Sequence, residues 1–299
     1  MPRALAVALL LLFGCGGGEP LRLGISMGEE GRRACRIAAA EINAAGGIDG
    51  RPLELRFASH GEAIQAQPAI AAADGFARDA SILGVVGHSN SSSSLAASQI
   101  YNSHRLPHIA PTTTAPLFTS AGPFSYRLVP DDRGQGKFLA SQTPTAGQGS
   151  RVAIMYVNDD YGRALFEELR RELERLGVEV VYEAPFLEEA AASQFEGTLP
   201  ALARRPPGLL FWLGRSGNLT PILPPLRAAF PDMMIIGSDG LETPDIYETP
   251  SYVGVRVVRP SSVAEILICS RKRANRIRSA LFIRVRPSLG CSCPPPTGA

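Results

Sequence analysis

The sequence predicts an α/β protein with two lobes, each built on a doubly wound parallel sheet. Short apolar runs of strand length alternate with longer amphipathic helical patterns, once before about residue 125 and again after it. A chain of 299 residues, 45% hydrophobic and 19% charged, is long enough for two such lobes and has an ordinary globular composition.

The apolar runs predict seven strands in chain order. These are LRLGIS (21–26), LELRF (53–57), ILGVVG (82–87), RVAIMYV (151–157), VEVVYEA (178–184), GLLFWLG (208–214) and MMIIGS (233–238). Helical spacing of apolar residues runs from Ala34 to Ala45 and again over 160–176, where Asp159 or Asp160 is a suitable N-cap. Strands and helices that alternate in this way predict parallel sheets covered by helices on both faces.

The N-terminus has the features of an export signal. Arg3 precedes an apolar run from Ala4 to Phe13, which is too short to span a bilayer. The following LFGC resembles the lipobox of bacterial lipoproteins, in which cleavage leaves a lipid-modified cysteine, here Cys15. An ordinary signal peptide with an incidental cysteine is the alternative. Both interpretations export the chain, with residues 1–15 removed or processed and 16–20 as a tether.

The cysteines and histidines predict no metal site and no cofactor. With Cys15 lipid-modified, Cys35 is alone in the main body and the other three cysteines lie near the C-terminus, so no disulfide framework is implied. His104 and His108 are separated by Pro107, which prevents one continuous helical face. The net charge of +2 gives no reason to expect a nucleic-acid partner.

Two hydroxyl-rich segments follow neighbouring strands. GHSNSSSSLAAS (87–98) is either a flexible spacer or a turn that opens a helix, and its place between a strand and a helical pattern favours the turn. PTTTAP (111–116) follows the next apolar segment. Such turns offer hydroxyl groups and helix N-terminal N–H groups to an anion, and the two could converge on one carboxylate. The alternative is that serine and threonine only cap and form turns.

Six segments in this order carry a family resemblance: EINAAGGIDGRPLEL, GVVGHSNSSSSLAA, LPHIAPTTTAPLFT, FSYRLVPDDRGQGKFLA, VAIMYVNDDYGRAL and IIGSDGL. Together they resemble the leucine/isoleucine/valine-binding proteins, the periplasmic solute-binding subunits of branched-chain amino-acid ABC transporters. The resemblance covers about 21–258. It implies the type I periplasmic-binding-protein fold, in which two hinged lobes close on a ligand. It places 21–129 and about 253–260 in the first lobe and 130–252 in the second.

The resemblance also implies roles for individual residues. Ser91, Thr112 and Thr114 match the positions that hold the α-carboxylate of an amino acid, with the backbone carbonyl of Thr112 meeting its ammonium group. Tyr161 matches an aromatic residue that closes over the ligand, and Asp239 an acidic partner of the ammonium. The alternatives are that Tyr161 packs on its own helix and that Asp239 only forms a turn.

Three features depart from the family pattern. The loop that usually follows the first strand is missing, because GISM passes directly to GEEGRR. Arg215 occupies a position where an aromatic ligand contact is common. We expect it to be solvated, and the alternative is that it favours a ligand with a polar or anionic side chain. Residues 261–299 hold seven Lys or Arg and one acid, Glu265, and look like translation in a wrong frame, with a lipid-binding basic tail as the alternative.

The expected function is therefore binding, without catalysis, of an amino acid, branched-chain or aliphatic, or of an amide. The binding protein is expected to be lipid-anchored in the periplasm or cell envelope and to deliver its ligand to ABC permease subunits. A sensory receptor of the same fold and a non-functional truncated copy are the alternatives. A serine hydrolase is not supported. GHSNS resembles a nucleophile elbow centred on Ser89, but Ser91 replaces the last glycine and no histidine follows His108.

Overall fold

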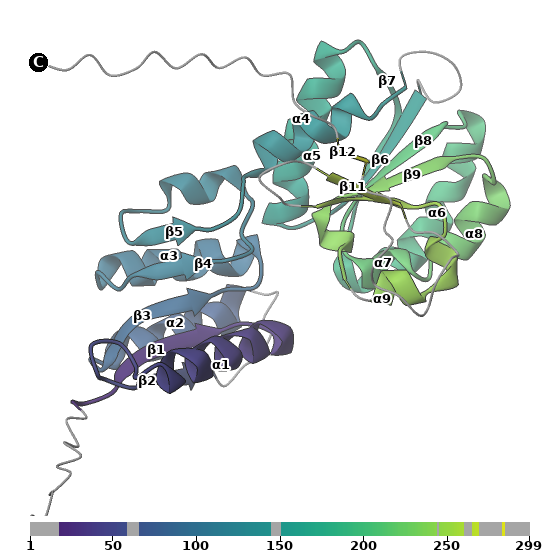
Figure 1. The fold of residues 1–299 in the computed structure, drawn as a ribbon. Helices are drawn as coiled ribbons and strands as arrows, with labels where there is room; N and C mark the ends of the chain where they lie inside the picture. The colour runs from purple at the N-terminus through teal and green to yellow at the C-terminus, as the bar shows by residue number, and fades with distance from the viewer. Residues whose placement is uncertain are drawn as a thin grey trace, which may run out of the picture.

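The computed structural model describes residues 18–58, 66–144, 151–243, 245–259, 265–268 and 283–284. They form two α/β lobes, one from the N-terminal part of the chain and one from the C-terminal part (Figure 1). Cys15, the signal segment and most of the 261–299 tail lie outside the described residues. Within the described ranges, no helix is long and apolar enough to cross a bilayer.

The first lobe is built on a parallel sheet of five strands in the order β2-β1-β3-β4-β5. Its strands are β1 (Leu21–Ser26), β2 (Leu53–Phe57), β3 (Ile82–Gly87), β4 (His108–Ala110) and β5 (Ser125–Arg127). Its helices are α1 (Glu29–Ala44), α2 (Ala66–Arg78), α3 (Ser91–Ser103) and the short 3-10 helix η1 (Pro116–Ser120). The first three predicted strands are confirmed at their predicted bounds.

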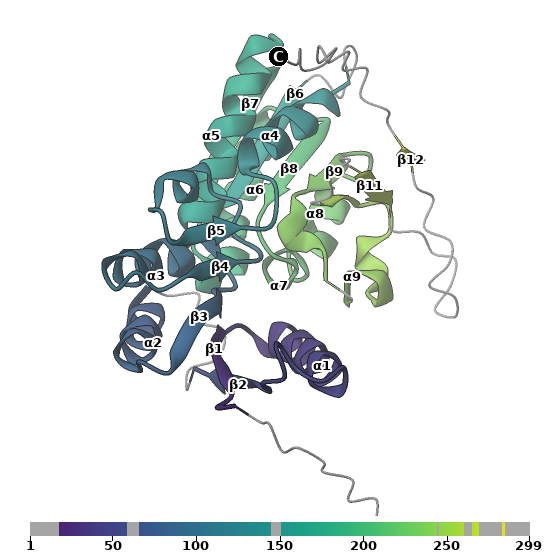
Figure 2. The ribbon, with the colours of Figure 1, turned by 60° about the vertical axis from the view of Figure 1, so that its left-hand side comes forward.

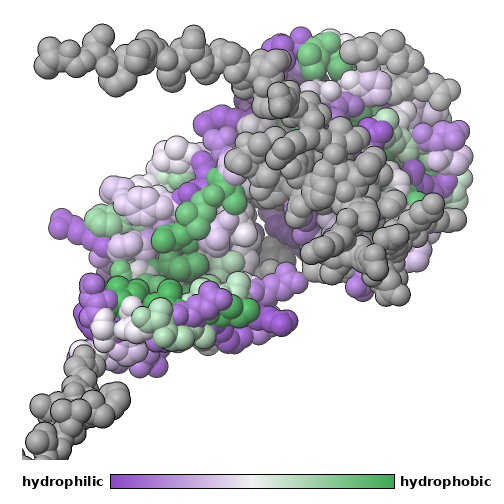
Figure 3. All heavy atoms as spheres, viewed as in Figure 1, coloured by the Kyte–Doolittle hydropathy of each residue, from purple (hydrophilic) through white to green (hydrophobic). Residues whose placement is uncertain are grey.

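The covering of this sheet differs from the expectation. Helix α1 packs on β1 and β2, and α2 and α3 pack on the central and C-terminal strands. Ile109 and Tyr126, which are register partners on β4 and β5, are nevertheless 36% and 54% exposed. Hydrophobic residues are visible on this lobe in Figure 3. The alternation of strands and helices predicted two covered faces, but it does not specify that every strand receives a helix on both sides.

The second lobe has five parallel strands in the order β10-β9-β8-β6-β7, extended at the β10 edge by antiparallel β11 and β12. Its strands are β6 (Arg151–Val157), β7 (Glu179–Phe186), β8 (Leu209–Leu213), β9 (Met234–Gly237), β10 (Arg256–Arg259), β11 (Glu265–Ile268) and β12 (Ile283–Arg284). Strand β8 is buried at every position, as its continuous apolar sequence LLFWL predicts for a central parallel strand.

Helices cover this sheet and complete the larger of the two cores (Figure 2). They are α4 (Asp132–Ser141), α5 (Asp160–Arg175), α6 (Ala191–Arg204), α7 (Ser216–Leu219), α8 (Leu223–Ala229), α9 (Asp245–Glu248) and the 3-10 helices η3 (Glu188–Ala190), η4 (Asp239–Leu241) and η5 (Pro250–Tyr252). The leucine stripe of α5 is buried as predicted, and Phe186 stacks on Trp212 with 4.4 Å between ring centroids.

One lobe assignment is corrected by the strand pairing. Residues 253–260 were expected to return to the first lobe, but β10 pairs in parallel with β9 through Arg256–Ile236 and Val257–Gly237. Val257 and Val258 are buried in the core of the second lobe. The apolar sequence of this segment fits either sheet, so the pattern alone did not select its partner.

Helix α4 connects the lobes and packs closely on α5. A Cβ atom built on Gly136 would lie 2.8 Å from the Cβ of Glu168, so only glycine allows this approach. At its N-terminus, the N–H of Asp132 donates to the carbonyl of Thr114 in the first lobe (3.0 Å). This helix therefore carries its first turn to the junction between the two lobes.

Candidate functional site

The serine segment forms a helix-opening turn, not a spacer. Strand β3 ends at Gly87, and Asn90 caps α3 by accepting the N–H of Ser93 (2.9 Å). Ser91 is the first residue of the helix and is 1% exposed, and its Oγ accepts the N–H of Ala115 (3.3 Å). The turn thus presents a capped helix N-terminus at the carboxyl end of the sheet, where an anion is favoured.

The threonine segment lies directly against this turn, as expected from the neighbouring strands. Thr113 Oγ1 donates to Ser94 Oγ at 2.6 Å, so the two segments are hydrogen-bonded to each other. Thr114 is 4% exposed, whereas Thr112 is exposed and its hydroxyl approaches the carbonyl of His88 at 3.4 Å. Of the hydroxyl groups predicted for the site, those of Ser91 and Thr114 are buried.

His88, Tyr101 and His108 form a buried layer of rings that packs beneath the serine and threonine turns. His88 Nδ1 lies 3.0 Å from Ser26 Oγ and its Nε2 lies 3.1 Å from the Tyr101 hydroxyl. His108 Nε2 lies 2.5 Å from the carbonyl oxygen of Gly87 and donates to it. Burial lowers the pKa of His88 to about 3 and that of His108 to about 4, so both rings are neutral near pH 7. This layer holds the end of β3 in place without adding charge.

In the second lobe, the structure brings Tyr161 and Asp239 together. Tyr161 is in the first turn of α5, and its hydroxyl donates to Asp239 Oδ1 at 2.5 Å and accepts the N–H of Gly240 at 3.1 Å. The same hydroxyl lies 2.7 Å from Ser238 Oγ. Burial, followed by the charge of Asp239, raises the pKa of Tyr161 well above its ordinary value, so the phenol stays a donor. Tyr161 and Asp239 are thus hydrogen-bonded to each other, and their contact with a ligand stays a prediction.

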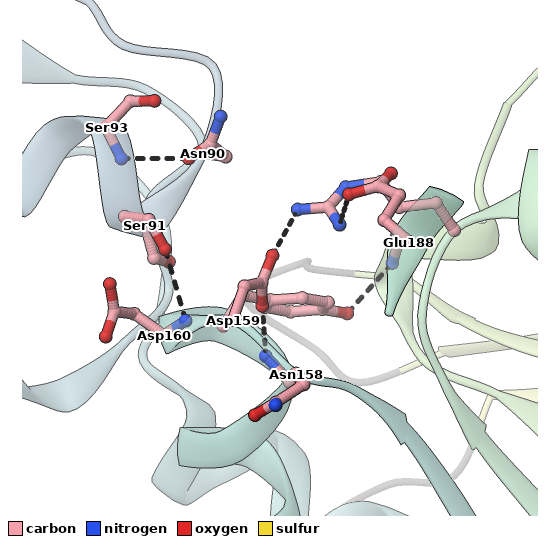
Figure 4. A network of polar contacts seen from close by, with 12 residues as sticks. Asn90, Ser91, Ser93, Asn158, Asp159, Asp160 and Glu188 are labelled. Carbon is pink, nitrogen blue, oxygen red and sulfur yellow. Dashed lines mark hydrogen bonds and ion pairs between the residues drawn. The ribbon is translucent and has the colours of Figure 1, made fainter. Parts of the chain in front are cut away.

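The two halves of the candidate site face each other across the lobes. Ser92 Oγ accepts the N–H of Asp160 at the start of α5, with an O–N distance of 3.1 Å. Figure 4 shows the Asn90–Ser93 turn opposite Asp159 and Asp160 of the second lobe. The first half offers hydroxyl and N–H groups, and the second offers carboxylates. Such an arrangement suits a small molecule that carries a negative and a positive group at its two ends.

Arg215 is not solvated, contrary to the expectation. Its side chain is 23% exposed and its two terminal nitrogens bind Asp159 Oδ2 and Glu188 Oε2, each at 2.8 Å. Its guanidinium also lies over the ring of Tyr161, 5.8 Å from the centroid. Burial alone would lower the pKa of Arg215, but the two carboxylates outweigh it and raise that pKa. The sequence did not show that two acids, 27 and 56 residues away, would meet this arginine.

Asp132 and Gln135 lie beside the predicted site residues, although neither was predicted to belong to the site. Both lie in the first turn of α4, and Asp132 is fully buried. The side chain of Gln135 makes a hydrogen bond to Asp239 that lowers the pKa of that carboxyl, although burial has the larger effect and raises it. Two signals for these residues were in the sequence: their place in the segment FSYRLVPDDRGQGKFLA, and the acidic pair of Asp131 and Asp132. Asp131 is the N-cap and accepts the N–H of Arg133.

The short connection after β1 is confirmed. Only Met27 and Gly28 separate β1 from α1, and the N–H of Gly28 donates to Ser89 Oγ at 2.9 Å. Ser89 is therefore engaged with a backbone amide, while the neighbouring ring of His88 is directed to Ser26 and Tyr101. This geometry does not support a nucleophile elbow. In the part of the chain that the structure describes, no group of three or more histidine, cysteine or acidic residues is arranged to hold a metal ion.

Comparison with known proteins gives consistent relatives. An "Amino acid binding protein" from Pseudomonas aeruginosa is 29% identical over 233 residues, which are 76% of this chain and 61% of the relative. A "Leucine-, isoleucine-, valine-, threonine-, and alanine-binding protein" from the same organism is 26% identical over 73% of this chain and 58% of its own length. The chain thus spans about three fifths of the length of these relatives.

A solved structure of a binding protein has a similar fold. A leucine-binding protein from Thermotoga maritima superposes with a TM-score of 0.71 over 80% of this chain and 69% of its own, at 20% identity. This similarity shows the fold, which is that of the type I periplasmic binding proteins. The model of the family described as "Periplasmic binding protein", a family of solute-binding proteins and not of enzymes, matches residues 23–258. By this match over most of its length, the chain belongs to the periplasmic binding protein family.

Proposed function

We propose that this protein captures an amino acid, branched-chain or otherwise aliphatic, between its two lobes outside the cytoplasm and delivers it to the permease subunits of an ABC transporter. The observation that carries the proposal is the division of the site. Ser91 and Thr114 lie with a helix N-terminus on the first lobe, and the Tyr161–Asp239 pair lies on the second. The first side is suited to an α-carboxylate and the second to an α-ammonium.

The chemistry of the two sides supports a zwitterion as the ligand. A buried charge is costly unless it is paired and hydrogen-bonded, so each end of an amino acid needs its own partners. Hydroxyl groups and backbone amides at the start of α3 would donate to the carboxylate, and Asp239 would accept from the ammonium. The Tyr161 hydroxyl holds Asp239 in place through the 2.5 Å hydrogen bond. The two Pseudomonas aeruginosa relatives are amino-acid-binding proteins by their names, which agrees with this assignment.

Thermal melting of residues 16–299 against leucine, isoleucine, valine and a panel of other amino acids and amides tests the proposal. At about 100 times Kd a ligand adds roughly 2.7 kcal/mol of stability, which is a shift of several degrees. We expect Ser91→Ala to weaken binding by about 10-fold or more, because a hydrogen bond to a charged group is lost. Ser103→Ala, at the exposed far end of the same helix, is the matched control. A cooperative melt that no amino acid or amide shifts would exclude the proposed function.

Membrane attachment through Cys15 is part of the same proposal. In cells, Cys15→Ser should move the protein from the membrane fraction to the soluble envelope fraction, because the acyl chains that hold it would be absent. Fractionation followed by immunoblotting measures this. If the substituted and unsubstituted proteins are equally soluble, the segment is an ordinary signal peptide and the anchor is excluded.

A further inference from the structure

Four buried oxygen atoms near the junction of the lobes have no hydrogen-bond partner in the described structure. They are Oδ1 and Oδ2 of Asp132, Oε1 of Gln135 and Oγ1 of Thr114. Asp132 is fully buried, so water does not hydrogen-bond its carboxylate from bulk solvent. Buried polar groups in native proteins are nearly always satisfied, and an unsatisfied carboxylate is especially unfavourable. The carboxylate and amide oxygens can only accept, and the one donor that the described residues place near them is the Thr114 hydroxyl, so acceptor positions are left over for another donor.

The oxygen atoms without a partner lie next to the hydrogen-bonded pair of Tyr161 and Asp239. Asp132 and Gln135 are three residues apart and so lie on one face of α4. Gln135 hydrogen-bonds Asp239, and the backbone N–H of Asp132 donates to Thr114. The cluster thus connects the threonine turn of the first lobe with the acidic side of the second, at the point where the chain crosses between them.

Among the described residues, no cation is free to neutralise the carboxylates of both Asp132 and Asp239. Arg215 is committed to Asp159 and Glu188, and Arg127 bonds Ala115 and Thr119 and lies 3.7 Å from Asp131. The charge of Arg127 lowers the pKa of Asp132, but its effect is the smallest of those that act on this carboxyl group.

Burial, and then the negative charges of Asp239 and Asp131, raise the pKa of Asp132 well above its usual range. The nearby Thr114 hydroxyl lowers that pKa by less than burial raises it. Burial likewise raises the pKa of Asp239. Two buried carboxyl groups that lie close enough for the charge of one to raise the pKa of the other hold a proton more tightly than an isolated one does.

We propose that Asp132 is a second acidic ligand of the amino-acid ammonium, acting with Asp239, and that the ammonium displaces a proton held by these two carboxyl groups. This rests on the proposed function and identifies the ligand class of its acidic side as a primary amine. In the exchange, a carboxylic acid loses its proton to solvent, the ammonium keeps its three protons, and these donate to the Asp132 and Asp239 oxygens. No covalent bond forms or breaks in the ligand.

Isothermal titration calorimetry in phosphate and in Tris measures the proton release, because the two buffers differ in ionisation enthalpy. Leucine, isoleucine and valine are each titrated into residues 16–299. We expect release of up to about one proton per bound amino acid, and an affinity that rises with pH through the titration of the pair. Asp132→Asn should bind about 10- to 100-fold more weakly and release no proton.

The melting temperature separates a ligand role from a structural one. Without amino acid, Asp132→Asn should melt at a higher temperature than the unsubstituted protein, because an unpaired buried carboxyl is replaced by an amide that can donate to Gln135 and Thr114. Asp131→Asn is the matched control, since asparagine is an equally good N-cap. It removes one of the smaller contributions to the raised pKa of Asp132, so affinity should change by less than about 3-fold and binding should still release a proton.

The outcomes distinguish the two proposals. If none of the three amino acids binds the unsubstituted protein, the proposed function fails in this form and the Asp132 assignment fails with it. If one binds without proton release and Asp132→Asn binds it equally well, only the Asp132 assignment is overturned. A variant that loses both affinity and melting temperature, or that still releases a proton, overturns it as well.

Discussion

Replacing Arg215 by methionine is expected to lower the free energy of unfolding by about 2–4 kcal/mol, because it leaves two partly buried carboxylates without their shared cation. Asp159 and Glu188 have side-chain exposures of 15% and 25%, so water screens them poorly. Asp159 also caps α5 by accepting the N–H of Gly162 (2.8 Å), so its displacement would loosen the turn that carries Tyr161. Urea unfolding followed by circular dichroism measures the change.

Arg163→Met is the matched control for this substitution. Arg163 lies in the first turns of α5, the helix that Asp159 caps, and it pairs with Asp160, but its side chain is 49% exposed. Its loss should change the free energy of unfolding by no more than about 0.5 kcal/mol. Adding Asp159→Asn and Glu188→Gln to Arg215→Met should return much of the lost stability, because the uncompensated charges are then removed. Equal stability of the Arg215 and Arg163 variants would contradict the structural role of this ion-pair group.

The second large effect is a loss of stability in acid caused by His88 and His108. Their pKa values of about 3 and about 4 in the folded protein lie below the ordinary value of 6.5, which applies when the chain is unfolded. Between these values the unfolded chain binds protons and the folded chain does not. The stability from each neutral ring is complete above about pH 6.5 and is lost as the pH falls, by about 2 kcal/mol per histidine between pH 8 and pH 5.

His108→Gln isolates one of these two contributions. The Gln side-chain amide can still donate to the Gly87 carbonyl, but it does not titrate. The fall in unfolding free energy between pH 8 and pH 5 should be smaller in this variant by about 2 kcal/mol. Asp132 and Asp239, whose pKa values are raised, act in the opposite direction, so the informative quantity is the difference between the variant and the unsubstituted protein. Parallel pH profiles for the two proteins would show that His108 is protonated in the folded state.

The sequence predicted the elements of the fold because local patterns define them. The apolar runs at 21–26, 53–57, 82–87 and 151–157 became β1, β2, β3 and β6 at those bounds, and the leucine stripe of α5 became a buried helix face. The order of the strands in each sheet could not be predicted from these local patterns. Residues 253–260 are apolar enough for either lobe, and only pairing with β9 placed β10 in the second sheet.

The candidate site divides in the same manner. The sequence by itself determined that Ser91 and the threonine turn follow adjacent strands, because the carboxyl ends of parallel strands lie at one edge of a sheet. The tertiary structure alone decided that Tyr161 would bond Asp239 and that Arg215 would be shared by Asp159 and Glu188. It also decided that the carboxylate of Asp132 would be buried with no cation beside it among the described residues. Burial and pairing of a charged side chain depend on groups that are distant in the chain, and neither spacing nor periodicity records which of them will meet.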